Sequence, residues 1–306
     1  MKMGISFIAT MSILAGLISI GTAQADRLFP SKNNIRAFKI QASGLPATQH
    51  LNYYGGAVLS NVKVIAVFWG KNVDQEVVRD IGGFYSHVVN STYIDWLDEY
   101  NTKILSTTGK PGTNQNIGRG SFVGGITITP ANSGTRLDKK DIEAEIEWQI
   151  NNGGLTVPTA NTLYMIHFPA GITLLTGGQA SCTAWCGDHE GFHSAKHGDV
   201  AYAMLPDIGP SCGSGCTFAG NDFDSMTVIV SHELIESITD PMCPDIGVNP
   251  AFPAAWLAAD QNEIGDICAG PGVPLASLTS ASRKYAIQAE FDNTTNSCKG
   301  GNFNSP

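Results

Sequence analysis

The sequence is poor in positive charge, and it has no long apolar run after its N-terminal segment. It contains 18 lysine and arginine residues against 27 aspartate and glutamate residues, for a formal net charge of −9. Because an acidic surface repels phosphates, this balance argues against nucleic acid as a partner. No segment beyond residue 25 is apolar enough to span a bilayer, so we expect no membrane contact once the N-terminal segment has been removed.

The sequence also lacks internal repeats and phosphate-binding loops. Its glycine-rich stretches "GGFYSHVV" and "GRGSFVGG" do not have the strand-glycine-helix context in which such loops bind phosphate. Nothing in the sequence therefore indicates a nucleotide, a haem or a flavin.

The N-terminus has the pattern of a secretory signal peptide. Lys2 precedes an apolar run that ends at Ile20, and Ala23 and Ala25 supply the small residues of a cleavage site. This pattern predicts a secreted or periplasmic protein, and the alternative is an uncleaved N-terminal anchor. The expected organisation is a signal peptide over 1–25, a polar leader over 26–52 and a single domain over 53–306.

Seven cysteines remain after the predicted cleavage, and an exported protein can form disulfides. Cys182 and Cys186 lie four positions apart, as do Cys212 and Cys216, and the other three are scattered towards the C-terminus. A zinc ribbon is disfavoured because each close pair has a three-residue spacer rather than two and the compartment is oxidising. We therefore expect two local disulfide clips, one within each close pair, with one cysteine left over.

Apolar periodicity predicts strands and helices from residue 62 onward. Buried strands are expected at "VKVIAVFWG", "NTLYMIHFP" and "DVAYAMLPD", with a short strand at "GITITP". Helices are expected in "DQEVVRDIGGFYSHVVNSTYIDWLDEY", "LDKKDIEAEIEWQINNGG" and "DFDSMTVIVSHELIESITDP". Apart from the third strand, 171–222 reads as loop, and 242–306 reads as loop with one short strand at "KYAIQAEFD". The expected fold is α/β (α+β), a mixed sheet with packed helices and disulfide-stabilised loops.

Capping residues define the ends of two helices. Asp138 is a plausible N-cap of the second helix, and Asp222 or Asp224 can cap the third. Pro241 disfavours helix at the preceding residue, so the third helix should end near Thr239.

Two stretches have the i, i+4 spacing that places two metal ligands on one helix face. "CGDHEGFHSAKHG" offers His189 and His193, and "SHELIESITDP" offers His232 and Glu236. The first is rich in glycine, so we expect a polar loop, a short surface helix, or a peripheral metal site that also uses His197. The second lies on an apolar helix that can hold a site rigidly. Its alternative is a core helix without a metal, but buried ionisable groups without a strong partner are costly.

The stretch "HELIESITD" followed by "NEIGD" resembles the pattern of thermolysin-type (gluzincin) metallopeptidases, whose zincin-like helix carries the active site. The resemblance implies His232, Glu236 and Glu263 as metal ligands and Glu233 as the general base. It further implies that Asp266 and Asp240 orient the ligands.

This sequence departs from the gluzincin pattern at two positions. Glu236 stands where the family has a histidine, and Asp266 is one residue closer to Glu263 than the pattern expects. Two carboxylates neutralise a divalent cation and favour harder ions. Zn²⁺ is therefore the expected ion, with Mn²⁺ or Ca²⁺ as competitors.

Most of the chain after residue 52 resembles the EXORDIUM, or phosphate-induced, protein family. The stretches that carry this resemblance are "YYGGAVLSNVKVIAVFWG", "SCTAWCGDH", "SCGSGCTF", "MTVIVSHELIESITDPM", "GDICAG" and "SRKYAIQAEFDNTTNSC". His189 matches a family position, whereas His193 and His197 do not. The family includes plant cell-wall proteins that look degenerate at the positions of the His-Glu-Leu-Ile-Glu motif. The resemblance therefore implies a bacterial-type member with an ancestral metallohydrolase site.

The same resemblance bears on the cysteines. Six of them match family positions: Cys182, Cys186, Cys212, Cys216, Cys268 and Cys298. The resemblance implies a third bridge between Cys268 and Cys298 and leaves Cys243 as the extra cysteine.

These observations support two hypotheses about function. The first is a secreted metal-dependent hydrolase, a zinc metallopeptidase in which Glu233 takes a proton from an activated water during attack on a peptide or protein substrate. The second is a non-catalytic extracellular EXORDIUM-like protein, in which the same residues hold a structural ion and the partner is an extracellular or cell-wall component.

Overall fold

A computed structural model describes residues 49–244, 253–269 and 275–306 of the chain. The predicted signal peptide and nearly all of the predicted leader lie outside these residues. In the described ranges the chain forms a mixed α/β fold, as the sequence predicts. The four α-helices of these ranges are Gln75–Val88 (α1), Thr92–Asp95 (α2), Lys139–Asn151 (α3) and Asp222–Thr239 (α4).

The central element is a five-stranded sheet in the order β3-β2-β5-β9-β8. Its strands are Asn61–Trp69 (β2), Gly118–Ile128 (β3), Thr162–His167 (β5), Asp188–Ser194 (β8) and Gly198–Leu205 (β9). Neighbouring strands are parallel except at the edge, where β8 pairs antiparallel with β9. The three predicted buried strands are confirmed as β2, β5 and β9, and "GITITP" overlaps the end of the longer β3.

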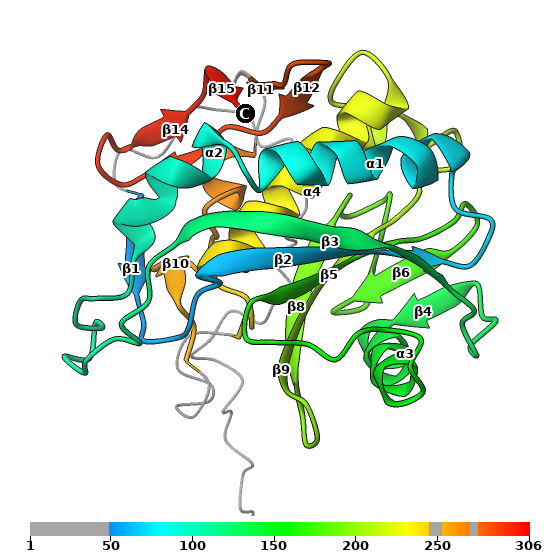
Figure 1. Ribbon diagram of the computed structural model, residues 1–306, viewed down its shortest axis with the longest axis horizontal. Coiled ribbons are helices and arrows are strands. Elements are labelled where there is room, and N and C mark those ends of the chain that lie inside the picture. Colours follow the sequence, from blue (N-terminus) through cyan, green and yellow to red (C-terminus); the bar gives the residue numbers. More distant parts are fainter. Residues whose placement is uncertain (1–48, 245–252, 270–274) are drawn as a thin grey trace, which may run out of the picture. The chain divides into compact units, whose positions relative to one another are not determined.

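Helices cover both faces of this sheet (Figure 1). Side chains alternate along β2, so that Val64 and Phe68 pack in one core with α1 and α4, whereas Ile65 and Val67 pack in a second core with α3. The side chain of Asp138 accepts hydrogen bonds from the first turn of α3, which confirms the predicted cap.

Helix α4 crosses the larger core and is buried on all sides. Asn221, rather than Asp222 or Asp224, is its N-cap, because the Asn221 side chain accepts a hydrogen bond from the backbone N–H of Asp224 at 2.8 Å. The two aspartates lie in the first turn instead, where the positive end of the helix dipole stabilises them. The helix ends at Thr239, as Pro241 predicts.

The region 171–222 is not the loop that the sequence predicts. It includes strands β6 (Thr173–Thr176), β7 (Gln179–Ala180) and β8 beside the predicted β9. The prediction was wrong because hydrogen bonding to β9 along the whole of β8 outweighs the low strand propensity of its residues. The His-Glu-x-x-His stretch is therefore neither a loop nor a helix but an edge strand.

The C-terminal part also holds more strands than predicted. The stretch "KYAIQAEFD" is divided between β12 (Lys284–Ile287) and β13 (Glu290–Asp292), which belong to different sheets. Leu51, assigned to the leader, is fully buried in β1 (Leu51–Tyr53) and pairs with β10 (Trp256–Ala258). The remaining strands and 3-10 helices are Arg136–Asp138 (β4), Ala276–Thr279 (β11), Ser297–Lys299 (β14), Asn302–Asn304 (β15), Trp96–Tyr100 (η1), Gly213–Cys216 (η2) and Asp266–Cys268 (η3).

Three disulfides join distant segments, and the two predicted local clips are wrong. Cys182 bonds to Cys212 and Cys186 bonds to Cys216, with Cα–Cα distances of 4.9 and 5.6 Å. The two cysteines of the first close pair therefore each bond to one cysteine of the second pair, because the loop before β8 lies against η2. The Cys268–Cys298 bridge agrees with the one that the family resemblance implies.

The disulfides are consistent with an oxidising extracellular or periplasmic setting. Within the described ranges, no helix has both the length and the apolar character needed to cross a bilayer.

Candidate metal centre

Helix α4 carries three buried ionisable side chains on one turn. His232, Glu233 and Glu236 are 5%, 2% and 2% exposed. Nε2 of His232 lies 3.1 Å from Oε2 of Glu236, one helical turn away, and 3.8 Å from Oε1 of Glu233. Burying such groups costs free energy unless they meet opposite charge, so this turn requires partners from other elements.

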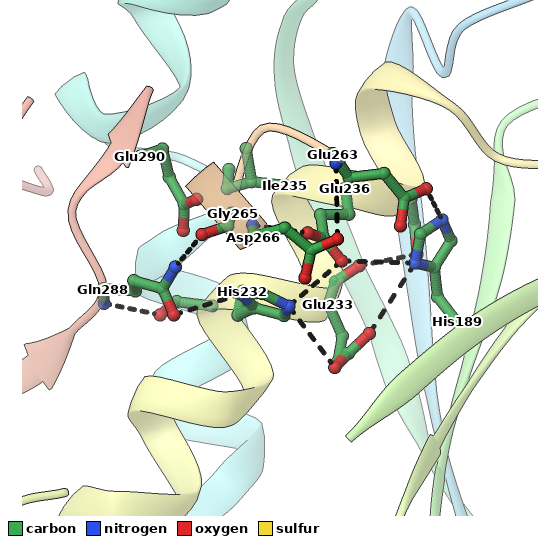
Figure 2. Close-up of polar contacts among 12 residues, drawn as sticks. His189, His232, Glu233, Ile235, Glu236, Glu263, Gly265, Asp266, Gln288 and Glu290 are labelled. Atoms are coloured by element: carbon green, nitrogen blue, oxygen red, sulfur yellow. Dashed lines mark hydrogen bonds and ion pairs between the residues drawn. The ribbon is translucent and has the colours of Figure 1, made fainter. Parts of the chain in front are cut away.

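His189 on β8 is one of these partners. It is 1% exposed, and its Nδ1 lies 3.6 Å from Oε2 of Glu233 and 3.5 Å from Oε2 of Glu236. Its other nitrogen, Nε2, lies 3.4 Å from Oε1 of Glu263. Figure 2 shows His189 between Glu263 and the two glutamates of α4.

The segment from Glu263 to Asp266 contacts α4 through its backbone. The N–H of Asp266 donates to Oε1 of Glu236 at 3.1 Å, and the N–H of Glu263 donates to Oδ2 of Asp266 at 3.3 Å. A Cβ at Gly265 would overlap Nδ1 of His232, so only glycine permits this approach. We use the name His-Glu cluster for His189, His232, Glu233, Glu236, Glu263 and Asp266.

Gln288 orients His232. The Gln288 side-chain amide donates to the carbonyl oxygen of Gly265 at 2.7 Å, so its Oε1 is the acceptor that lies 3.0 Å from Nδ1 of His232. Nδ1 therefore carries a proton, and Nε2 is the nitrogen directed at the two α4 glutamates. An orienting hydrogen bond of this kind is typical of metal-binding histidines.

The cluster shifts the pKa values of its members in opposite directions. Burial alone would lower the pKa of His189 and of His232, but the surrounding carboxylates raise both pKa values well above the usual range of imidazole. Burial raises the pKa of Glu233, against the opposing effect of the two imidazoles. For Glu236 the imidazoles outweigh burial and hold its pKa below the usual carboxyl range. The cluster is thus a strongly coupled set of charges.

Three overlapping groups of side chains in this region could hold a metal ion. In each group one ligand atom per residue lies within 4.8 Å of the others, and the groups are His232/Glu236/Asp266, His189/Glu233/Glu236 and His189/Cys243/Glu263. A fourth group, of cysteine sulfurs, consists of disulfide-bonded residues and is not available to a metal.

The donor atoms fit a divalent cation. Four carboxyl groups face two imidazoles, so the cluster can carry more negative than positive charge. A Cβ at Gly187 would lie 2.5 Å from Oε1 of Glu233, so glycine backbone lines the cluster here as it does at Gly265. Carboxylate and imidazole together suit Zn²⁺ and also harder ions such as Mn²⁺.

No family model, curated protein or solved structure matches this chain. The two family resemblances therefore stay predictions.

The structure brings together most of the residues that the sequence singled out. His232, Glu236 and Asp266 form one possible ligand group, although Asp266 was expected to orient a ligand rather than to be one. Glu263, the expected third ligand, belongs to a different group with His189 and Cys243. The expected orienting residue Asp240 accepts from the backbone N–H of Ala255 at 2.9 Å through its side chain. Its carbonyl oxygen lies 3.1 Å from Nε2 of His189.

The other histidines of the first motif lie away from the cluster. His193 is exposed and its Nδ1 is 2.8 Å from Oδ1 of Asp199, while Nε2 of His197 contacts Asn151 at 3.1 Å. On a strand, successive side chains point to opposite faces, so His189 faces α4 whereas Glu190 forms an ion pair with Lys139 of α3. The literal His-Glu-x-x-His motif therefore does not form a metal site.

Sequence reasoning did not assign roles to Gln288 and Cys243. It named His189 as a candidate ligand together with His193 and as a family position, but not as a partner of the α4 glutamates. The leftover status of Cys243 was the one local signal for that residue. Gln288 contacts His232 across a separation of 56 residues, and nothing in its neighbourhood indicates a role.

Proposed function

We propose that the chain is a secreted metal-dependent hydrolase, a metallopeptidase that uses one divalent ion, with Zn²⁺ as the first candidate. The observation that carries this proposal is the arrangement around Nε2 of His232. Nδ1 of His232 hydrogen-bonds to Gln288, and Nε2 lies 3.1 Å from Oε2 of Glu236. Asp266 is the third residue of this group of possible ligands. His232, Glu236 and Asp266 would hold the ion, which leaves one position of a tetrahedral site open.

A divalent ion in such a site supplies Lewis-acid chemistry, because it lowers the pKa of water and polarises a carbonyl. The remaining steps belong to the chain. Glu233 follows His232 in the sequence and lies 3.8 Å from its Nε2, so its carboxylate can take a proton beside the ligands. His189, 3.6 Å from Oε2 of Glu233, would orient that carboxylate and stabilise its charge.

The similarity of "HELIESITD" and "NEIGD" to the gluzincin pattern supports a peptide substrate. An amide carbonyl next to the ion would be attacked by water while Glu233 holds the proton that water loses. Glu233 would then pass this proton to the leaving amine.

A second candidate function is favoured by the burial of the cluster. Its residues on α4 and β8 are at most 5% exposed, which suits an ion that stabilises the fold. A cavity of about 650 Å³ lies near the carboxyl ends of β2 and β3, and Trp69, Asn132 and Ile172 are among the residues that line it. None of the cluster residues lines this cavity. The chain would then be an extracellular binding protein with a structural ion.

The test combines metal analysis with a peptide-library assay on the full chain purified without chelator. Glu233→Gln should keep the metal and lose activity by about 10²–10⁴-fold. Glu76→Gln, which changes an exposed first-turn glutamate of α1, should keep both.

Each outcome separates the candidates. Stoichiometric metal without any peptide hydrolysis, together with a large loss of thermal stability on chelation, would favour the structural ion. Wild-type protein without stoichiometric metal would overturn both functions.

A further inference from the structure

The only cysteine outside the three disulfides of the described chain lies next to a histidine and a glutamate of the His-Glu cluster. Ligand atoms of Cys243, His189 and Glu263 all lie within 4.8 Å of one another. The three side chains are each 1% exposed. We infer that they form a second metal site, distinct from the group of His232, Glu236 and Asp266, and that this site selects a thiophilic ion such as Zn²⁺.

The chain holds these three side chains together through close backbone contacts. A Cβ at Gly191 would lie 2.8 Å from both Cα of Met242 and the carbonyl oxygen of Pro241, so glycine lets β8 touch the turn that follows α4. Gly191 and His189 share one face of the strand. The backbone N–H of Cys243 donates to the carbonyl oxygen of Asp240 at 3.2 Å, which holds the thiol-bearing turn against the end of α4.

The two nitrogens of His189 have separate surroundings. Nε2 lies 3.4 Å from Oε1 of Glu263 and is the nitrogen that would bind the ion. Nδ1 lies 3.5 Å from Oε2 of Glu236, which suits an N–H directed at a carboxylate. Metal-binding histidines commonly donate their second N–H in this way. The carbonyl oxygen of Asp240, 3.1 Å from Nε2, accepts a hydrogen bond from it when no ion is bound and offers a further donor when one is.

The charges of the three ligands match a divalent ion. A neutral imidazole, a thiolate and a carboxylate together carry two negative charges, so the loaded site is neutral and suits its burial. Binding releases the thiol proton of Cys243 and also the proton that Nε2 of His189 donates to Asp240 in the absence of an ion. Thiolate and imidazole favour Zn²⁺ over Ca²⁺ or Mg²⁺, whereas the carboxylate-rich first site also accepts harder ions.

Cobalt substitution tests the second site. The full chain, purified from an oxidising compartment and stripped with chelator, is titrated with Co²⁺ and followed in the ultraviolet. We expect two equivalents to bind, one of which produces a thiolate-to-cobalt charge-transfer band. Since the other six cysteines are disulfide-bonded, this band reports on Cys243.

Variants assign each equivalent. Cys243→Ser should lose the band and one equivalent, whereas His232→Ala should lose the other equivalent and keep the band. His193→Ala, which changes an exposed histidine of the same strand, should keep both. If His232→Ala keeps the charge-transfer band, the second site is supported whether or not the first site binds an ion.

The wild-type protein alone can overturn the inference. A Co²⁺ complex without a thiolate band, or a Zn²⁺ complex whose X-ray absorption spectrum lacks a sulfur neighbour at about 2.3 Å, excludes Cys243 as a ligand. Neither measurement depends on the folding of a variant.

Discussion

Nδ1 of His189 on β8 lies 3.5 Å from Oε2 of Glu236 on α4, and this contact joins the edge of the central sheet to the buried helix. Nε2 of the same ring faces Glu263. One imidazole therefore bridges carboxylates from two separate parts of the chain.

His189→Ala should destabilise the protein far more than His193→Ala. The first change leaves three buried glutamates without their shared imidazole, and breaking a buried ionic contact costs about 3–5 kcal/mol. The second removes an exposed side chain and should change the free energy of unfolding by less than about 0.5 kcal/mol. Urea denaturation of both variants measures the difference, and equal effects would contradict the bridging role.

Gly265→Ala should distort the His232 site. The new methyl group would overlap Nδ1 of His232 and lie 2.9 Å from Oε1 of Glu236, which predicts about 1–3 kcal/mol of destabilisation together with weaker metal binding. Gly220→Ala is the control, because a Cβ there has no atom within 4 Å. Thermal unfolding and metal titration of the two variants should diverge, and unchanged metal affinity in Gly265→Ala would argue against His232 as a ligand.

Peptide mapping without reduction should recover Cys182 joined to Cys212 and Cys186 joined to Cys216. Replacing Cys182 and Cys212 together by serine opens a link across 30 residues and should lower the free energy of unfolding by about 3–4 kcal/mol. Recovery of Cys182 joined to Cys186 would instead restore the local clips that the sequence suggested.

Glu290 should make the chelator-treated protein less stable as the pH rises. Burial raises the pKa of Glu290 from 4.5 to about 8. Between these values the unfolded chain loses the proton while the folded chain keeps it. The free energy of unfolding should therefore fall through this range, by on the order of a few kcal/mol.

Glu290→Gln should flatten this pH profile. It removes the titrating group and keeps an acceptor for the hydroxyl of Tyr93, which donates to Oε1 of Glu290 at 2.9 Å. Chemical denaturation of both proteins near pH 5 and near pH 8 provides the measurement. Parallel profiles would show that Glu290 does not titrate in this range.

Local sequence patterns were sufficient for much of the fold. The apolar runs that became β2, β5 and β9, and the helical periodicity of α1, α3 and α4, are driven by burial on one or both faces, which is visible within a few residues. The end of α4 at Thr239 follows from Pro241 for the same local reason. Edge strand β8 was missed because its pairing with β9, rather than its composition, makes it a strand.

The sequence by itself determined the helix that carries His232, Glu233 and Glu236, because i, i+4 spacing and apolar periodicity are local properties of one segment. Only the tertiary structure decided which side chains meet that helix. His189, Gln288 and the segment from Glu263 to Asp266 reach it from a sheet edge and from C-terminal loops. Contacts of this kind depend on how separate elements pack, and the disulfide partners of Cys182 and Cys186 were decided in the same way.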